Sequence, residues 1–551
     1  MTAVSDATRR PTATGAETRG GALAGTGTLL RFNLRLDRVR IPVWVLALFL
    51  GTLATVNSRN ALYGTAADRA SVAKTMGSPA ALAMTGPRHY LDDYTIGSMI
   101  GHQLLGFTTI LVGLMSVLIV TRHTRTEEET GRAELVRSTV VGRHAHLASA
   151  LATAAVANLA LAVLLAAGLS GLGIEGMDGT GSLLFGLGHA AVGLAFAGIA
   201  AITVQVTAHA RGASGMALAA IGAAYVLRAA GDVGTDALSW LSPIGWIQRT
   251  YVFVDNNWWP LLLALALAVI TSAAGFALST RRDVGAGLEA ARLGRPAASD
   301  ALGRPLGFAL RLHRGMLIGF AAGLFVLGGM YGSILGEAAD MVENVEQVQK
   351  ALERIGGSVS DSFASMILVL VAVVASIYVV MAALRPRAEE SGGRAEPVLS
   401  TGLSRARWLG SHLAVAMLGG TGLLLLAGLG FGISGAASTG EDGLFLKVLG
   451  AALAYAPALW VTAGFAAAIY GWFPRATAAA WIVPVYAFVV GYLGQILDFP
   501  DWMDNLSPFG HVPQLPSADM DWTPLALLTL VAAALLWLGL AGFRRRDLDL
   551  K

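Results

Sequence analysis

The feature that most constrains this chain is a series of apolar stretches, each long enough to cross a lipid bilayer as a helix. A transmembrane α-helix needs about 20 mainly apolar residues. The 551 residues are 55% hydrophobic and 14% charged, whereas a soluble domain carries about 25% charged residues. The sequence therefore predicts an all-α, polytopic membrane protein with about 12 transmembrane helices. We expect the spans near residues 41–58, 97–121, 146–170, 183–208, 213–231, 259–280, 316–336, 362–384, 411–433, 444–470, 476–497 and 523–543.

The basic residues of the loops predict how the chain is oriented. Lys and Arg accumulate in loops on the cytoplasmic side of a membrane. Arginines are concentrated at 122–143, at 281–314 and near the C-terminus, while the loops at 171–182 and 434–443 contain no Lys or Arg. We therefore expect a multi-pass protein of a bacterial-type inner (plasma) membrane, with both termini in the cytoplasm.

An internal repeat divides the chain into two halves. Four segments recur in the same order: FNLRL (32–36) as FALRL (308–312), GRAELVRSTVVGR (131–143) as GRAEPVLSTGLSR (393–405), LSPIG (241–245) as LSPFG (506–510), and RRD (281–283) as RRD (545–547). This predicts two tandem six-helix halves with the same orientation, related by a pseudo-two-fold axis along the membrane normal. The expected parts are a disordered cytoplasmic N-terminus (1–29), a first half (30–283), a cytoplasmic linker (284–304) and a second half (305–551).

The loop after the second span carries an acidic pattern that recurs in the second half. Thr126 followed by Glu129 fits a capping box, which predicts a short helix at about 126–138. An ordinary solvated loop is the alternative, but recurrence of the pattern at 388–405 favours a functional role. The second copy contains a Gly pair and Pro397, which break helices. The two loops are therefore predicted to be unequal.

The order of these parts resembles the ABC-2 type transporter permeases. A basic approach helix precedes the first span, an acidic E-E-x-G-R-x-E segment follows the second, and an L-S-P segment precedes the sixth. The two-half chain is similar to the single-chain permeases of polyketide-antibiotic (tetronasin-type) exporters. The resemblance implies that the acidic segment is the coupling helix that contacts the ATPase. The matching residues are Glu128, Glu129, Gly131, Arg132 and Glu134 in the first half and Glu389, Glu390, Gly393, Arg394 and Glu396 in the second.

No nucleotide-binding motif is found in the chain itself. A P-loop requires G-x-x-x-x-G-K-[ST], which does not occur, and the absence of cysteine excludes thiolate metal sites. We therefore expect a transport subunit rather than an enzyme, without catalytic, cofactor or metal sites. The resemblance implies an ABC ATPase partner, two copies per chain, that binds ATP and Mg. The other expected partners are membrane lipid and a small hydrophobic substrate, and nucleic acid is not expected.

Polar side chains inside the apolar stretches of the first half are candidates for a substrate pathway. A charged residue at a span centre costs about 2.5–3.5 kcal/mol on insertion scales, so such residues often have a function. The alternative is a hydrogen bond that ties two helices together. Matching positions of the second half are mostly apolar, which favours an amphipathic substrate. The candidates are His102, Gln103, Asn158, His189 and Arg228.

These observations favour the permease subunit of an ATP-driven exporter of hydrophobic or amphipathic compounds, such as antibiotics or drugs. An ion-coupled secondary transporter is one alternative, although it would need mid-span carboxylates, which the sequence lacks. A membrane assembly or immunity protein that transports nothing is another.

Overall fold

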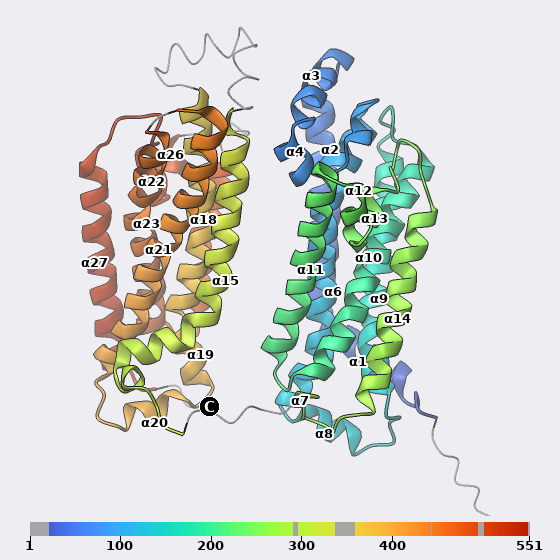
Figure 1. The fold of residues 1–551 in the computed structure, drawn as a ribbon. Coiled ribbons are helices and arrows are strands. Elements are labelled where there is room, and N and C mark those ends of the chain that lie inside the picture. Colours follow the sequence, from blue (N-terminus) through green and yellow to red (C-terminus); the bar gives the residue numbers. More distant parts are fainter. Residues whose placement is uncertain (1–20, 290–295, 337–358, 442, 494–500, 549–551) are drawn as a thin grey trace, which may run out of the picture. The chain divides into compact units, whose positions relative to one another are not determined.

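The protein is all-helical in a computed structural model, and no strand occurs in the part of the chain that the model describes (Figure 1). Eleven helices of that part are long and apolar enough to cross a membrane. The chain is therefore a polytopic all-α membrane protein. Helix α1 (Thr26–Leu36) begins within the segment expected to be disordered, most of which lies outside the description. The described residues are 21–289, 296–336, 359–441, 443–493 and 501–548.

The chain forms two compact units, Met1–Leu293 and Gly294–Lys551. Within the first unit, helix α10 lies at the centre and packs against four neighbouring spans, α6, α9, α11 and α14. Its apolar window is 78% buried, against 28% for α14. The long helices of this unit are α2 (Arg40–Leu62), α6 (Leu105–Thr121), α9 (Ala145–Gly171), α10 (Gly179–Val206), α11 (Ala210–Val233) and α14 (Trp259–Ser279).

The second unit differs from the expectation in one span. The stretch expected at 476–497 contains only a shorter apolar helix, Thr477–Gly491, in the described residues, and 494–500 lie outside them. This stretch is assembled from 3-10, α and π turns: η4 (Thr477–Trp481), α24 (Ile482–Phe488) and η5 (Val489–Leu493). The long helices are α15 (Pro305–Ser333), α18 (Val359–Ala383), α21 (Arg405–Thr439), α22 (Leu444–Ala454) with α23 (Ala456–Trp472), and α27 (Trp522–Arg545).

Small residues allow α15 and α21 to pack backbone against backbone. A Cβ atom placed on Gly328 would lie 2.2 Å from the carbonyl oxygen of Ala427, and one on Gly332 would lie 2.3 Å from that of Phe431. Close approach of small residues is a common way for helices to associate in membranes, where the hydrophobic effect does not drive association. A larger side chain at Gly328 or Gly332 would force the two helices apart.

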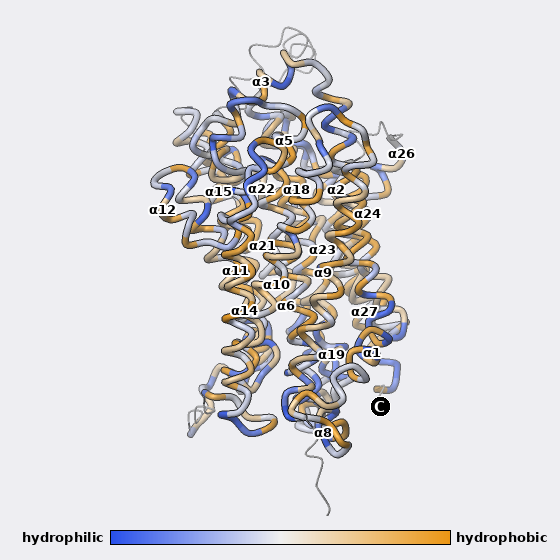
Figure 2. Tube along the Cα trace, turned by 90° about the vertical axis from the view of Figure 1, so that its right-hand side faces the viewer, coloured by the Kyte–Doolittle hydropathy of each residue, from blue (hydrophilic) through white to orange (hydrophobic). Residues whose placement is uncertain are grey.

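Short helices close both ends of each unit, and apolar residues dominate between them (Figure 2). We call the end that carries α7 (Glu127–Glu129) and α8 (Arg132–Arg137) in the first unit, or α19 (Arg385–Ser391) and α20 (Ala395–Leu399) in the second, the loop end. The opposite end is the cap end. The cytoplasmic location of the loop end and the two-fold relation between the halves stay predictions. The other short helices are α3 (Ala66–Met76), α4 (Pro79–Met84), η1 (Arg88–Leu91), α5 (Ile96–Gln103), α12 (Asp236–Ser239), α13 (Pro243–Gln248), η3 (Asp300–Gly303) and α26 (Asp501–Asp504).

Candidate functional site: the paired loops

The first acidic loop continues the second span instead of starting a new helix. Helix α6 passes through a π turn, η2 (Arg122–Thr126), directly into α7. Thr126 has helical backbone angles, φ −65° and ψ −37°, and its side chain caps nothing. The expected capping box and continuous helix at 126–138 are therefore wrong. The chain turns at Gly131, whose φ of 73° is a left-handed conformation that glycine adopts without strain, and then forms α8.

The second loop has the same construction. Helix α19 is followed by Gly393, with a φ of 68°, and then by α20. Pro397 is the third residue of α20 and does not break it, since the first N–H groups of a helix have no partner within the helix. The expectation that Pro397 breaks the helix is therefore wrong, because Pro397 falls where a helix tolerates proline, and the inequality of the two loop contacts stays a prediction.

The contacts also correct how the two acidic segments correspond. Arg132 faces Glu127 at 3.8 Å, and Arg394 faces Glu389 at 2.6 Å. Glu127 thus corresponds to Glu389, and Glu128 to Glu390. The expected match of Glu128 and Glu129 with Glu389 and Glu390 is shifted by one residue, since Glu129 corresponds to Ser391.

In the first unit, Glu128 is the centre of a buried ion-pair network. Its carboxylate accepts two hydrogen bonds from Arg282, at 2.8 and 2.9 Å, and one from Arg125, at 2.8 Å. The Glu128 side chain is 3% exposed and that of Arg282 is 7% exposed. Arg125 also donates to the carbonyl oxygen of Val204 at the end of α10, and Arg282 donates to the Gln205 side chain at 2.6 Å. We call the Glu128–Arg282 pair the first clasp, because it joins the loop to the segment that follows α14.

The second unit contains an equivalent clasp formed by Glu390 and Arg546. Arg546 donates to both carboxylate oxygens of Glu390 at 2.7 Å, and the Tyr470 hydroxyl donates to the same carboxylate at 2.6 Å. The Arg546 guanidinium lies 4.9 Å from the centre of the Tyr470 ring. Burial alone would lower the pKa of Arg546, but the paired hydrogen bonds with Glu390 raise it above its usual value. This cation therefore stays charged at any physiological pH.

The sequence alone did not lead us to predict a site role for the two clasp arginines. Arg282 and Arg546 occupy the same position of the repeated RRD segment, and their carboxylate partners belong to the repeated acidic segment. The recurrence of both segments was the signal in the sequence that could have identified these arginines. In each unit the two segments meet although they are 154 or 156 residues apart in the sequence.

The other predicted coupling residues lie nearer the surface, except Glu389, which is buried and paired with Arg394. Glu129 accepts a hydrogen bond from the backbone N–H of Ala210, at the N-terminus of α11, where a negative charge is favourable. Arg132, Glu134 and Glu396 are exposed. Two apolar side chains of the first loop are also exposed, Leu135 at 73% and Val140 at 90%. The first loop thus presents charged and apolar groups together at the loop end, and we call Arg132, Glu134, Leu135 and Val140 the exposed loop face.

Two of the five pathway candidates, His102 and Gln103, belong to a polar cluster at the cap end. The His102 ring nitrogens lie 2.9 Å from the Tyr94 hydroxyl and 3.0 Å from the Thr85 hydroxyl. Gln103 donates to the same Tyr94 hydroxyl at 2.8 Å. His102 is fully buried. These contacts hold α5 against the segments before it.

The remaining three candidates form contacts within the bundle of the first unit. Asn158 donates to the Ser116 hydroxyl at 2.9 Å, which joins α9 to α6. The His189 ring lies 2.7 Å from the Thr108 hydroxyl, which joins α10 to α6. Arg228 pairs with Asp232 at 3.4 Å and donates to the carbonyl oxygen of Met84 at 3.2 Å. All five candidates are therefore engaged in contacts that tie structure together, and their role in a substrate pathway stays a prediction.

The two comparisons with known proteins point to the same family. The family model described as "Multidrug efflux system permease Rv1217c, C-terminal domain" matches residues 27–278 and 302–544. The chain is 37% identical over 551 residues to the multidrug efflux system permease protein Rv1217c of Mycobacterium tuberculosis, and the alignment covers 98% of each chain.

Proposed function

The chain belongs to the family of the multidrug efflux system permease Rv1217c, and from this premise we propose that it is the membrane-spanning permease subunit of an ATP-driven ABC exporter. Its substrates are hydrophobic or amphipathic compounds of the drug or antibiotic type. A separate ABC ATPase, two copies per chain, binds ATP and Mg and drives transport. The loop ends face the cytoplasm, where the ATPase binds.

The observation that carries the proposal is the equal construction of the two loops. Each unit presents a helix, a left-handed glycine and a second helix at its loop end. Each loop is joined by a buried carboxylate–arginine clasp to the segment after the last helix of its unit, α14 or α27. A force applied to either loop would reach that helix directly, because the clasp is almost fully buried and doubly hydrogen-bonded. Two loops with the same backbone construction suit two copies of one partner, although Pro397 and Gly402 replace Leu135 and Val140 in the second loop.

The exposed loop face supplies the chemistry for a protein partner. Leu135 and Val140 are apolar and exposed, and Arg132 and Glu134 carry opposite charges beside them. Apolar groups surrounded by polar ones are typical of binding surfaces. Glu128 and Glu390 contribute differently, because their carboxylates are buried and hold the loops in place.

The buried carboxylates argue against the ion-coupled alternative. A proton- or sodium-coupled transporter binds its ion at carboxylates within the membrane. In the described residues, Asp37, Asp232, Glu128 and Glu390 are each paired with at least one arginine. A carboxylate neutralised by arginine is a poor site for a transported cation.

The test is ATP-dependent transport by inside-out membrane vesicles that contain the chain and the ABC ATPase that co-purifies with it. We expect a hydrophobic fluorescent dye to accumulate when ATP is added, with or without a protonophore. Accumulation that needs a proton gradient and not ATP would establish the secondary transporter instead. No accumulation by vesicles that contain the assembled complex would favour the non-transporting alternative.

A variant of the exposed loop face tests the docking surface separately. Arg132→Ala, Glu134→Ala and Leu135→Ser together should leave stability unchanged, because the three side chains are exposed. They should lower the amount of ATPase retained per chain, because only the second loop is left intact, and stop dye accumulation. Glu175→Ala, an exposed change near the cap end, is the control. An undiminished amount of ATPase per chain in a pull-down with the triple variant would reject this surface.

A further inference from the structure

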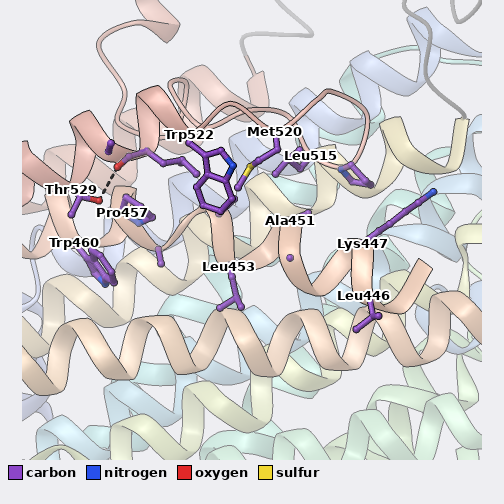
Figure 3. A pocket seen from close by; sticks show the side chains of 16 residues that line it. Leu446, Lys447, Ala451, Leu453, Pro457, Trp460, Leu515, Met520, Trp522 and Thr529 are labelled. Atoms are coloured by element: carbon purple, nitrogen blue, oxygen red, sulfur yellow. Dashed lines mark hydrogen bonds between the residues drawn. The ribbon is translucent and has the colours of Figure 1, made fainter. Parts of the chain in front are cut away.

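A large apolar cavity lies at the cap end of the second unit. Its volume is about 900 Å³, and it is an open pocket bordered by α22, α23, the segment before α27 and the first turns of α27 (Figure 3). Leu453, Pro457 and Trp460 line it from α22 and α23, and Leu515, Met520 and Trp522 line it from the other side. A cavity of this size is in the range that holds drug-sized molecules, about 300–1,000 Å³.

The span that borders the cavity is interrupted at one residue. Helix α22 ends at Ala454 and α23 begins at Ala456, with Pro457 in its first turn. Proline removes a backbone donor and its ring clashes with the preceding turn, so a long helix is interrupted there. The corresponding span of the first unit, α10, is one helix from Gly179 to Val206. The break is thus a feature of the second unit alone, within the described residues.

The polar groups around the cavity are largely occupied by the protein itself. The Trp460 ring N–H donates to the Thr421 hydroxyl at 3.1 Å, and the Thr529 hydroxyl donates to the Leu525 carbonyl oxygen at 2.8 Å. Lys447 donates to Glu441 at 3.1 Å, but its half-exposed ammonium has three N–H donors and can offer others to a ligand. In Figure 3 the Lys447 side chain extends away from Trp460 and Trp522. A ligand would therefore be held by apolar contact, with polar recognition only near Lys447.

We propose that this cavity binds hydrophobic, drug-sized molecules that contain flat rings, and that it accepts an anionic or hydrogen-bond-accepting group beside Lys447. The inference rests on the proposed export function and names a site for its substrates. The rings of Trp460 and Trp522 offer flat faces against which rings pack well, whereas a lipid acyl chain has no flat face to match. Because no fixed array of hydrogen bonds defines the ligand, compounds of different structure fit the same walls.

Gly450 provides a way to fill the cavity without rebuilding the protein. It lines the cavity, and a Cβ atom placed on it would meet no atom within 4 Å. Gly450→Trp should therefore project a ring into the space that a ligand needs. Gly422 is the matched control, because it lies in α21, outside the cavity lining, and its Cβ position is equally open.

The experiment measures binding of two fluorescent probes, N-phenylnaphthylamine and its sulfonated analogue, to the full chain in phospholipid nanodiscs, with empty nanodiscs as background. We expect one saturable site in the wild type and in Gly422→Trp, and a Kd raised about tenfold or more in Gly450→Trp. Lys447→Gln should weaken binding of the sulfonated probe while leaving the neutral probe unchanged.

Three results would overturn the proposal. The first is that Gly450→Trp binds the probes as the wild type does. The second is that both Trp variants lose binding equally. The third is that no protein shows saturable probe binding, while the wild type retains phospholipid that Gly450→Trp releases. The last result would make the cavity a lipid site. ATP-driven dye transport by a wild type that binds no probe would reject the cavity and leave the proposed function standing. Saturable binding without transport would reject the function.

Discussion

Glu128→Gln should destabilise the first unit strongly, although it changes only one atom. The substitution keeps the shape of the side chain but removes the negative charge shared by Arg125 and Arg282. Both arginines are then left buried without a counter-charge, at side-chain exposures of 0% and 7%. Removing one partner of a buried ion pair costs about 3–5 kcal/mol. We expect the upper part of this range, because Glu128 accepts three hydrogen bonds from charged donors.

Arg282→Met should cost less, about 3 kcal/mol at the lower end of the same range, because Glu128 keeps its bond to Arg125 and is not left without a positive partner. The double variant should be less destabilised than the sum of the two single ones, because Glu128→Gln strands the charge of Arg282, which Arg282→Met removes. Glu134→Gln, on the exposed loop face, should change the stability by less than about 0.5 kcal/mol.

The assay is equilibrium unfolding of the purified chain in mixed micelles, followed by tryptophan fluorescence. Equal stability of Glu128→Gln and Glu134→Gln would refute the clasp as a structural element. Strict additivity of Glu128→Gln and Arg282→Met would show that the two side chains do not interact.

Two further predictions follow from the same contacts. Gly131→Ala and Gly393→Ala should each cost about 1–2 kcal/mol, because both positions are left-handed, and unequal costs in the same unfolding assay would contradict the equivalence of the loops. His189→Leu should cost about 1–3 kcal/mol through the lost bond to Thr108 and, as a predicted pathway residue, should also alter the substrate range or the rate of dye transport per folded molecule. Unchanged transport per folded molecule would leave His189 with the helix contact alone.

Hydropathy predicted the fold well because the bilayer fixes the length of a span. The stretch expected at 183–208 is α10, Gly179–Val206, and the stretch expected at 411–433 lies within α21, Arg405–Thr439. The span expected at 476–497 was less predictable. Apolar composition alone does not distinguish a regular helix from a stretch of mixed 3-10, α and π turns such as Thr477–Leu493.

The acidic loop was predicted less well because tertiary contacts override its local signals. Thr126 and Glu129 have the spacing of a capping box, but the span helix does not end before them. Arg125, held by Val204 and Glu128, lies within the π turn that carries the helix onward. The repeat identified both segments of each clasp, but it could not show that the segments meet, since that depends on how the spans pack.

The most direct test of the central claim is the native mass of the complex that the tagged chain forms in its own membrane. We predict one permease chain with two copies of a single ABC ATPase, because the chain itself carries two loops of the same backbone construction. Two permease chains with two ATPase copies would show that only one loop of each chain is used. A complex without any ATPase would contradict the account.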